Sequence, residues 1–240
     1  MRCQSVQMGF FWVLLFSVVT MAQTSQSNRP PADQEGPSDS ALIRALVTRN
    51  EHYARQLLDS GASPNQKDRF GATPLAVTIL LHNSDFAEVL IQKGADVNLV
   101  EDHKGTSPLM TAARYCDMKT AKLLLERGAV VNHRDENGET ALGSAADACK
   151  DGDMLKLLIA HGAQINVKTD LGRTPLIEAS FNGNEPAVRE LVQAGADLNI
   201  KDNDGATAQS SACGRLIGRE QSHDKICAFL RNVGSQGATN

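Results

Sequence analysis

Glycine recurs along most of this chain with a single period, and that recurrence constrains the fold more than any other feature. One series, spaced by 34, 33, 34 and 33 residues, consists of Gly71, Gly105, Gly138, Gly172 and Gly205. A second series with the same period opens five "GA" or equivalent pairs, at residues 61, 94, 128, 162 and 195. Self-similarity at a period of this size is the signature of stacked repeats. We therefore expect an array of repeated layers from residue 39 onward.

Each repeat carries the same local signals in the same order. Gly71 and its equivalents end a turn that needs a positive φ, which glycine adopts at little cost. A Thr or Ser follows two residues later, usually before Pro, which is the pattern of a helix N-cap with Pro in the first turn. A Leu-rich segment such as 123–125 predicts the second helix, and Gly128 and its equivalents predict its left-handed end. The order predicts helix, turn, helix and a β-hairpin finger.

The motifs resemble those of the ankyrin repeat. They are "TPL" at 73–75 and 174–176, "SPL" at 107–109, "GADVN" at 94–98 and "GADLN" at 195–199. The resemblance implies an all-α repeat solenoid, an ankyrin array of helix-turn-helix layers with short β-hairpin fingers. We divide it into an N-terminal half-repeat cap (39–67), repeats 68–101, 102–134, 135–168 and 169–201, a C-terminal cap repeat (202–234) and a flexible tail (235–240). The His that usually follows "TPL" in this family is replaced here by Ala76, Met110, Gly143 and Ile177.

The first 38 residues differ from the rest. Residues 1–22 combine one Arg, the apolar run "MGFFWVLLFSVVTMA" and small residues before a cleavage point after Ala22. This is the layout of a secretory signal peptide, and the apolar run is shorter than the roughly 20 residues that span a bilayer. Residues 23–38 are rich in Pro, Ser, Gln and Asp and predict a disordered tether. We expect export, with the bacterial periplasm as the leading compartment and extracellular or host-delivered forms as alternatives.

Four cysteines follow the predicted signal peptide, and an even number in an exported protein favours disulfides. In the repeat register Cys213 and Cys227 face each other across the two helices of the last repeat, which predicts a bridge between them. Cys116 and Cys149 occupy equivalent turns of neighbouring repeats, about 10 Å apart if the layers are regular. The repeat 135–168 contains one extra residue beside Cys149, which could close that gap. Buried free thiols remain the alternative for all four.

Several function classes are disfavoured by what the sequence lacks. After loss of Arg2 with the signal peptide, the 24 basic residues become 23 against 28 acidic ones, so nucleic acid and anionic membrane surfaces are poor partners. We find no phosphate-binding glycine loop, no HExxH, GxSxG or CxxC motif, and expect no enzyme activity and no cofactor. A weak candidate metal set lies on neighbouring fingers and consists of His103, His133, Asp102 and Asp135, although solvated finger residues are the commoner explanation.

Binding information must lie at positions that the repeat leaves free, namely the finger tips and the ends of the short helices, which line one face of such arrays. Aromatic side chains make up only 4% of the chain, so those at free positions stand out as interface anchors, although packing against the next repeat also explains Phe70 and Phe181. The candidate partner-binding residues are Arg69, Phe70, Leu80, Leu81, His103, Lys104, Arg114, Tyr115, Glu136, Asn137, Glu139, Asp147, Leu171, Arg173, Phe181 and Asn182.

These observations predict an exported, non-enzymatic scaffold that binds another protein. Its candidate face is basic early and acidic later, which would orient a partner. Exported bacterial ankyrin proteins that are similar to this chain often accompany secreted or periplasmic enzymes. The resemblance therefore implies an immunity protein or inhibitor of a secreted toxin enzyme, or an accessory to a periplasmic enzyme. A ligand- or metal-dependent activity on the fingers and an effector delivered to a host cell remain alternatives. The sequence does not specify the oligomeric state, and we expect a monomer.

Overall fold

The computed structural model describes residues 41–101, 104–214 and 221–237, and the chain divides into two compact units at residues 63 and 64. The predicted signal peptide and tether lie outside the described residues, as do Asp102, His103 and the last three residues of the predicted tail. None of the helices in the described ranges combines the length and apolar character that crossing a lipid bilayer requires.

The described part of the first unit is a pair of helices, α2 (Ala41–Val47) and α3 (Glu51–Asp59). The turn between them begins α3 with Asn50, whose side chain accepts the backbone N–H of Tyr53 at 3.1 Å. Leu42 and Leu46 are buried in α2, and Leu58 in α3. This helix pair lies within residues 39–67, where the sequence predicted a half-repeat cap.

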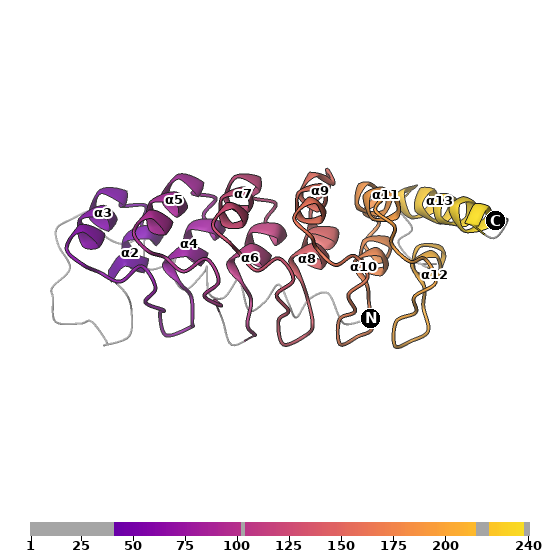
Figure 1. Ribbon diagram of the computed structural model, residues 1–240, viewed down its shortest axis with the longest axis horizontal. Helices are drawn as coiled ribbons and strands as arrows, with labels where there is room; N and C mark the ends of the chain where they lie inside the picture. The colour runs from indigo at the N-terminus through magenta and orange to yellow at the C-terminus, as the bar shows by residue number, and fades with distance from the viewer. Residues whose placement is uncertain (1–40, 102–103, 215–220, 238–240) are drawn as a thin grey trace. The chain divides into compact units, whose positions relative to one another are not determined.

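In the second unit the described helices form five layers of two helices each, in chain order. They are α4 (Pro74–Leu80) with α5 (Ser84–Gln92), α6 (Pro108–Arg114) with α7 (Met118–Glu126), α8 (Ala141–Ala148) with α9 (Asp153–Ala160), α10 (Pro175–Phe181) with α11 (Glu185–Gln193), and α12 (Ala208–Cys213) with α13 (Gln221–Gly237). Figure 1 shows the first helices of these layers in one row, the second helices in another, and the finger loops projecting beside the first helices. The predicted repeat solenoid is confirmed.

The local signals act as the sequence predicted. Each first helix begins at a hydroxyl side chain that accepts a backbone N–H three residues later, the five being Thr73, Ser107, Thr140, Thr174 and Thr207. Both glycine series have positive φ, for example 84° at Gly71 and at Gly128. A glycine with positive φ therefore lies at two places in each repeat, in the finger turn and at the end of the second helix.

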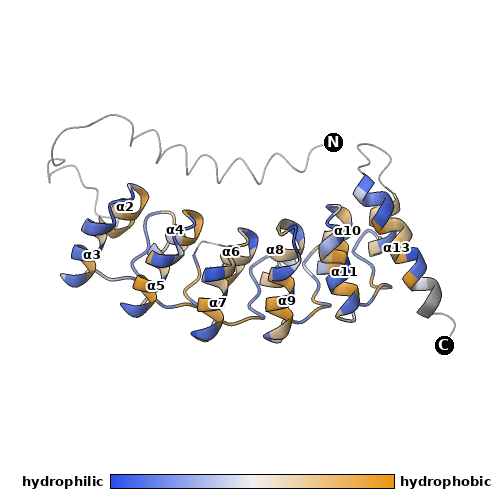
Figure 2. Cartoon of the chain, turned by 90° about the horizontal axis from the view of Figure 1, so that it is seen from above, coloured by the Kyte–Doolittle hydropathy of each residue, from blue (hydrophilic) through white to orange (hydrophobic). Residues whose placement is uncertain are grey.

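The core of the second unit is built from small and aliphatic side chains. Ala112 and Ala113 in α6 and Ala145 and Ala146 in α8 are fully buried, and α6 packs directly against α8. Phe86 is a fully buried aromatic residue within α5. In Figure 2 hydrophobic and hydrophilic residues alternate around the helices of both rows, as expected for thin layers that each bury one face against a neighbour.

Two details differ from the sequence prediction. The predicted β-hairpin fingers are turns, since no strand occurs in the described residues. Each turn is closed by a short backbone contact, such as Asp68 N to Ala72 O at 3.0 Å, which is too little pairing for a ladder. The last helix, α13, continues to Gly237, beyond the predicted repeat end at residue 234 and into the predicted tail.

The structure contains both disulfide pairings considered from the sequence. Cys213 and Cys227 join the two helices of the last layer, with Cα atoms 5.1 Å apart. Cys116 and Cys149 join neighbouring layers, with Cα atoms 5.6 Å apart, inside the usual range for disulfides. The turn after α8 is rebuilt here: Cys149 is extended, with φ −85° and ψ 123°, and Gly152 with φ 74° begins α9.

Candidate functional site

Three finger tips are tight turns whose shape is held by an aspartate side chain. The Oδ1 atom of Asp68 accepts the backbone N–H groups of Phe70 at 2.9 Å and of Ala72 at 2.8 Å. Asp135 and Asp202 hold their own turns in the same way. Because the turn backbone is fixed from inside, the residues between these contacts point outward in a defined geometry.

Successive fingers are joined by backbone hydrogen bonds across their tips. Each bond runs from an N–H to a carbonyl oxygen of the finger before it: Glu136 to Lys104 (2.8 Å), Asp170 to Asn137 (2.9 Å) and Asn203 to Leu171 (3.1 Å). We call these six tip residues the finger strip. The strip brings together four of the predicted binding residues and holds them in register, which the sequence pattern alone did not predict.

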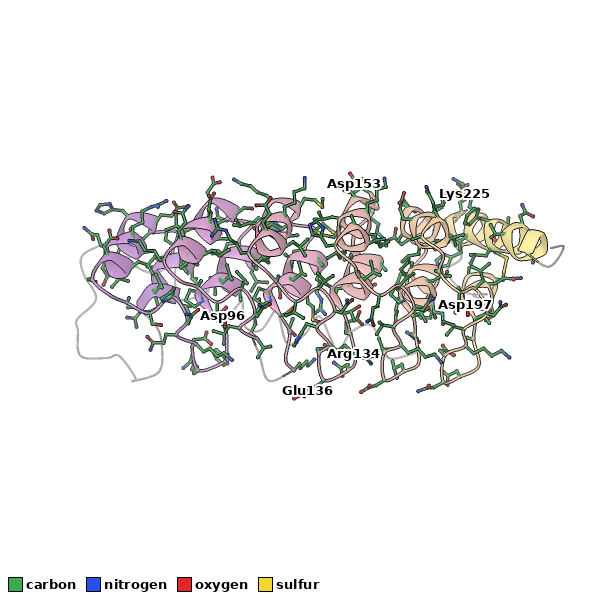
Figure 3. The ribbon with its side chains drawn as sticks, viewed as in Figure 1. Asp96, Arg134, Glu136, Asp153, Asp197 and Lys225 are labelled. Carbon is green, nitrogen blue, oxygen red and sulfur yellow. A yellow bond between two sulfur atoms is a disulfide. The ribbon has the colours of Figure 1, made fainter. Side chains whose placement is uncertain are left out.

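Two large apolar side chains at the finger tips are exposed. Phe70 is 40% exposed and Leu171 is 62% exposed. The guanidinium of Arg69 lies 4.7 Å from the centre of the Phe70 ring. Figure 3 shows Glu136 at the tip of its finger and Asp153 on the opposite side, at the start of α9. Exposed apolar groups beside charged groups are the composition of a protein-binding surface.

The predicted residues at the ends of the short helices are more enclosed. Arg114 and Asp147 are exposed, whereas Leu80, Leu81, Tyr115, Phe181 and Asn182 are half-buried. The Tyr115 ring meets the His82 ring edge to face, with centres 6.1 Å apart. Asn182 donates from Nδ2 to Asp147 Oδ1 at 2.5 Å, which links α10 to α8. These residues therefore connect neighbouring layers as well as facing outward.

Arg173 is the centre of a charged cluster on the fourth finger. Its Nη1 atom is 3.4 Å from Glu178 Oε1, its Nε atom is 3.8 Å from Asp202 Oδ2, and its guanidinium lies 4.8 Å from the centre of the Phe181 ring. Sequence reasoning missed Glu178 and Asp202. The repeat register could have pointed to Asp202, since it is the equivalent of Asp68 and Asp135. Glu178 gave no signal.

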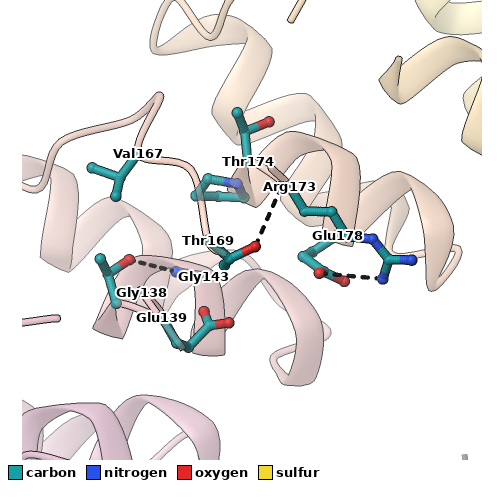
Figure 4. A pocket seen from close by; sticks show the side chains of 10 residues that line it. Gly138, Glu139, Gly143, Val167, Thr169, Arg173, Thr174 and Glu178 are labelled. Atoms are coloured by element: carbon teal, nitrogen blue, oxygen red, sulfur yellow. Dashed lines mark hydrogen bonds and ion pairs between the residues drawn. The ribbon is translucent and has the colours of Figure 1, made fainter. Parts of the chain in front are cut away.

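Glu139 lies in a small cleft between the third and fourth layers. Figure 4 shows this cleft, which has room for about one water molecule and is lined by Glu139, Gly143 and Glu178 among others. Burial raises the pKa of Glu139 to about 7, and the nearby Glu178 carboxylate adds to the rise. Burial also raises the pKa of Glu178, against the opposing effect of Arg173. Glu139 therefore changes charge near neutral pH.

The predicted metal set is not assembled in the described residues. His103 and Asp102 lie outside them, and His133 is engaged by its Nε2 atom with the carbonyl oxygen of Gly105 at 2.6 Å. Within the described ranges no three His, Cys, Asp or Glu side chains are grouped as a metal ion would require. The arrangement offers hydrogen-bonding groups, charges and apolar tips on a rigid support, which suits recognition of another macromolecule.

A family model for ankyrin repeats in three copies matches this chain at residues 94–169, 131–202 and 146–236. Together these matches cover residues 94–236, more than half of the 240 residues. The chain belongs to the ankyrin repeat family. The glycine-capped helix pairs and the turn-shaped fingers are thus the ankyrin layer, and the solenoid positions whatever site the protein has.

Curated relatives share short stretches of this ankyrin array. A mitochondrial disaggregase of Homo sapiens is 39% identical over 64 residues, which cover 27% of this chain and 9% of that protein. A cyclin-dependent kinase 4 inhibitor B of Mus musculus is 36% identical over 66 residues, 28% of this chain and 50% of that protein. An ankyrin repeat, SAM and basic leucine zipper domain-containing protein of Oryctolagus cuniculus is 31% identical over 80 residues, 31% of this chain and 17% of that protein. The chain spans half or less of the length of these relatives.

Proposed function

We propose that this chain is an exported, non-enzymatic ankyrin scaffold that binds a partner protein through its finger strip and the adjoining ends of the short helices. The family supports the general role, because ankyrin arrays act by protein–protein interaction. The observation that carries the proposal is the finger strip itself: backbone bonds fix its register, Leu171 within it is exposed, and Phe70 is exposed at the tip of the 68–72 finger that precedes it.

The charge order along this face supports a partner with two oppositely charged regions. The early part carries Arg69, Lys104 and Arg114, all exposed. The later part carries Glu136 and Asp147, also exposed. A complementary partner would dock in one direction only, because the reverse orientation places like charges together.

The partner we propose is an exported enzyme. This rests on the signal-peptide pattern of residues 1–22 and on cysteines paired as in proteins of oxidising compartments. One relative is by its name an inhibitor of a kinase, so a short ankyrin array of this kind can act on an enzyme. We place the protein in a bacterial periplasm, either as an inhibitor of a toxic enzyme or as an accessory that stabilises one.

The test is capture of a partner from the native exported fraction with the tagged chain. Phe70→Ala/Leu171→Ala should recover at least about tenfold less of the captured protein, since exposed apolar anchors dominate such interfaces. Val130→Ala is the matched control, because Val130 is 53% exposed on the loop after α7 and outside the proposed face. Equal recovery by wild type and the double variant would refute this face.

The roles then separate on the captured protein. Loss of its activity on addition of the chain indicates an inhibitor, and a rise in its thermal stability without loss of activity indicates an accessory. Stoichiometric metal in the purified chain would favour the alternative of a metal-dependent activity on the fingers, and capture only from host cytosol would favour a delivered effector.

A further inference from the structure

A buried asparagine links the third and fourth layers of the second unit. Asn184, at the start of α11, is 1% exposed. Its Nδ2 atom donates to two carbonyl oxygens of the layer before it, those of Ala146 and Cys149, both at 2.8 Å. One side chain therefore ties the start of a second helix to the end of the previous first helix and to the turn that follows it.

The layer before has no side chain at that position, because α9 begins at Gly152. Cys149 takes over the link. Its Sγ atom lies 3.1 Å from the carbonyl oxygen of Ala113 and is bonded to the Sγ atom of Cys116. Ala113 and Cys116 are the residues 33 positions before Ala146 and Cys149. Asn184 thus contacts Ala146 and Cys149 of the layer before it. One layer earlier, Cys149 contacts the two equivalent residues, Ala113 through its Sγ atom and Cys116 through the disulfide.

This bond lies directly beside the proposed partner-binding face. Arg114 and Tyr115 precede Cys116, and Asp147 precedes Cys149 by two residues. Arg114 and Asp147 are exposed at the ends of α6 and α8, where the basic part of the face changes to the acidic part. The bond that holds Cys116 against Cys149 therefore also fixes the distance between Arg114 and Asp147, across the boundary between the basic and the acidic part of the face.

We propose that the Cys116–Cys149 disulfide is a redox-controlled clamp that sets the spacing of the partner-binding face between α6 and α8. The proposal rests on the proposed function of that face. A dithiol reductant would break the S–S bond with two electrons and two protons, leaving two thiols and oxidising the dithiol to a disulfide. Cys149 is fully buried and Cys116 partly exposed, so Cys116 is the residue that a reductant reaches first.

The expected change is local. The apolar packing of α6 on α8 and the bond from Glu136 to Lys104 at the finger tips do not depend on the disulfide. After reduction of the disulfide, what remains of the link at the turn is the Cys149 thiol, which faces the carbonyl oxygen of Ala113. The turns at 114–117 and 147–152 would open while the layers stay stacked.

The second disulfide is a matched control. Cys213 and Cys227 lie within the last layer, and none of the described candidate binding residues belongs to that layer. The experiment compares the oxidised full chain, the chain treated with dithiothreitol, Cys116→Ser/Cys149→Ser and Cys213→Ser/Cys227→Ser. Hydrogen exchange is followed in peptides that contain residues 113–117 and 146–153.

We expect exchange in these peptides to be at least about tenfold faster in the reduced chain and in Cys116→Ser/Cys149→Ser, and unchanged in the control variant. Unchanged exchange in the folded, reduced chain would overturn the clamp. Should the serine variant not fold, alkylation of the dithiothreitol-treated wild type with mass spectrometry still decides: resistance of Cys116 and Cys149 to reduction in the folded state overturns the proposal.

Partner capture separates this inference from the function on which it rests. If the oxidised wild type captures a protein and the reduced chain recovers several-fold less, while Cys213→Ser/Cys227→Ser recovers it fully, the clamp controls the face. Equal recovery by oxidised wild type and Cys116→Ser/Cys149→Ser refutes the regulation and leaves the proposed function standing. If no form captures a protein, the proposed function fails, and redox control of partner binding is refuted with it.

Discussion

The carboxylate of Glu139 lies over the backbone of Gly143, in the space that a side chain at that position would fill. A Cβ atom at residue 143 would overlap Glu139 Oε1. In the other layers this helix position holds Ala76, Met110, Ile177 or Ser210, each of which has a side chain, whereas the glycine here leaves room for Glu139 to fold back onto the helix. The exchange of a core side chain for glycine thus creates a half-buried carboxyl on a face that otherwise binds solvent or partner.

The stability of the protein should fall as the pH rises from about 5 to about 8, and Glu139 should account for part of that fall. The pKa of its carboxyl rises from an ordinary value of 4.5 to about 7 in the fold, so the folded state holds a proton that the unfolded state has released. Between these values the unfolded state is favoured as pH increases, by up to about 3 kcal/mol in total. Urea unfolding of wild type and Glu139→Gln at several pH values measures this.

The comparison of wild type with Glu139→Gln separates the effect of Glu139 from that of the other titrating groups. Among its neighbours, Glu178 and Asp135 raise the pKa of Glu139, and Arg114 lowers it. We expect the free energy of unfolding of Glu139→Gln to increase relative to that of wild type as the pH rises through 7. Parallel pH profiles for the two chains would mean that this carboxyl ionises as it does in water.

Replacing Gly143 by alanine should stabilise the protein by about 0.5–1 kcal/mol. Inside a helix, alanine is more favourable than glycine by roughly that amount. The atom that the new Cβ meets is the end of the flexible Glu139 side chain, which can move into solvent. Thermal unfolding at pH 8 measures the gain, and the carboxyl 13C shift of Glu139 should then titrate near the ordinary pKa of a glutamate. A loss of stability would mean that Glu139 cannot leave the cleft.

Replacing Arg173 by glutamine should destabilise the protein by about 1–3 kcal/mol at pH 7, because Glu178 and Asp202 lose their shared cation while enclosed. Part of the lost stability should return as the pH is lowered, because protonation relieves the unpaired Glu178 carboxylate, whose pKa burial already raises. Arg189→Gln is the control, since Arg189 pairs with Glu185 at 2.7 Å and lies over Phe229 but is 52% exposed. We expect that control to cost less than about 1 kcal/mol. Equal losses of stability in Arg173→Gln and Arg189→Gln would mean that enclosure of the carboxylates does not make their ion pair more important.

The layers were predictable because their signals are local. A glycine at positive φ, or a Thr that caps a helix three residues later, acts within its own turn, so the period of such residues shows the repeat. The same locality placed Cys213 opposite Cys227. The family resemblance then supplied the order of helices and fingers, and the structure changed the expectation of hairpin strands and of where the last helix ends.

The candidate site was less predictable because its contacts cross layers. The bond from Asp170 to Asn137 and the ion pair of Arg173 with Asp202 depend on how far one layer advances on the next, which no single repeat encodes. The cleft at Glu139 depends on which way one side chain turns. The link between Cys116 and Cys149 depends on a turn rebuilt around one extra residue. The sequence raised that pairing, but it could not show that the bond replaces an asparagine contact.

Two glycines with positive φ should respond differently to alanine, and the difference tests the finger strip. Gly128, with φ 84°, has nothing within 4 Å of the position that a Cβ atom would take, so its substitution should cost only the strain of the left-handed backbone, about 1–2 kcal/mol. Gly172, with φ 73°, carries the same strain, but its Cβ would also lie 2.8 Å from the backbone nitrogen of Asn203. That contact breaks the bond from Asn203 to Leu171, so Gly172→Ala should cost at least about 1 kcal/mol more than Gly128→Ala. Hydrogen exchange should show the Asn203 amide losing protection in Gly172→Ala and keeping it in Gly128→Ala. Similar losses of stability with an equally protected Asn203 amide would mean that the finger tips move independently, and the strip could not present a rigid face.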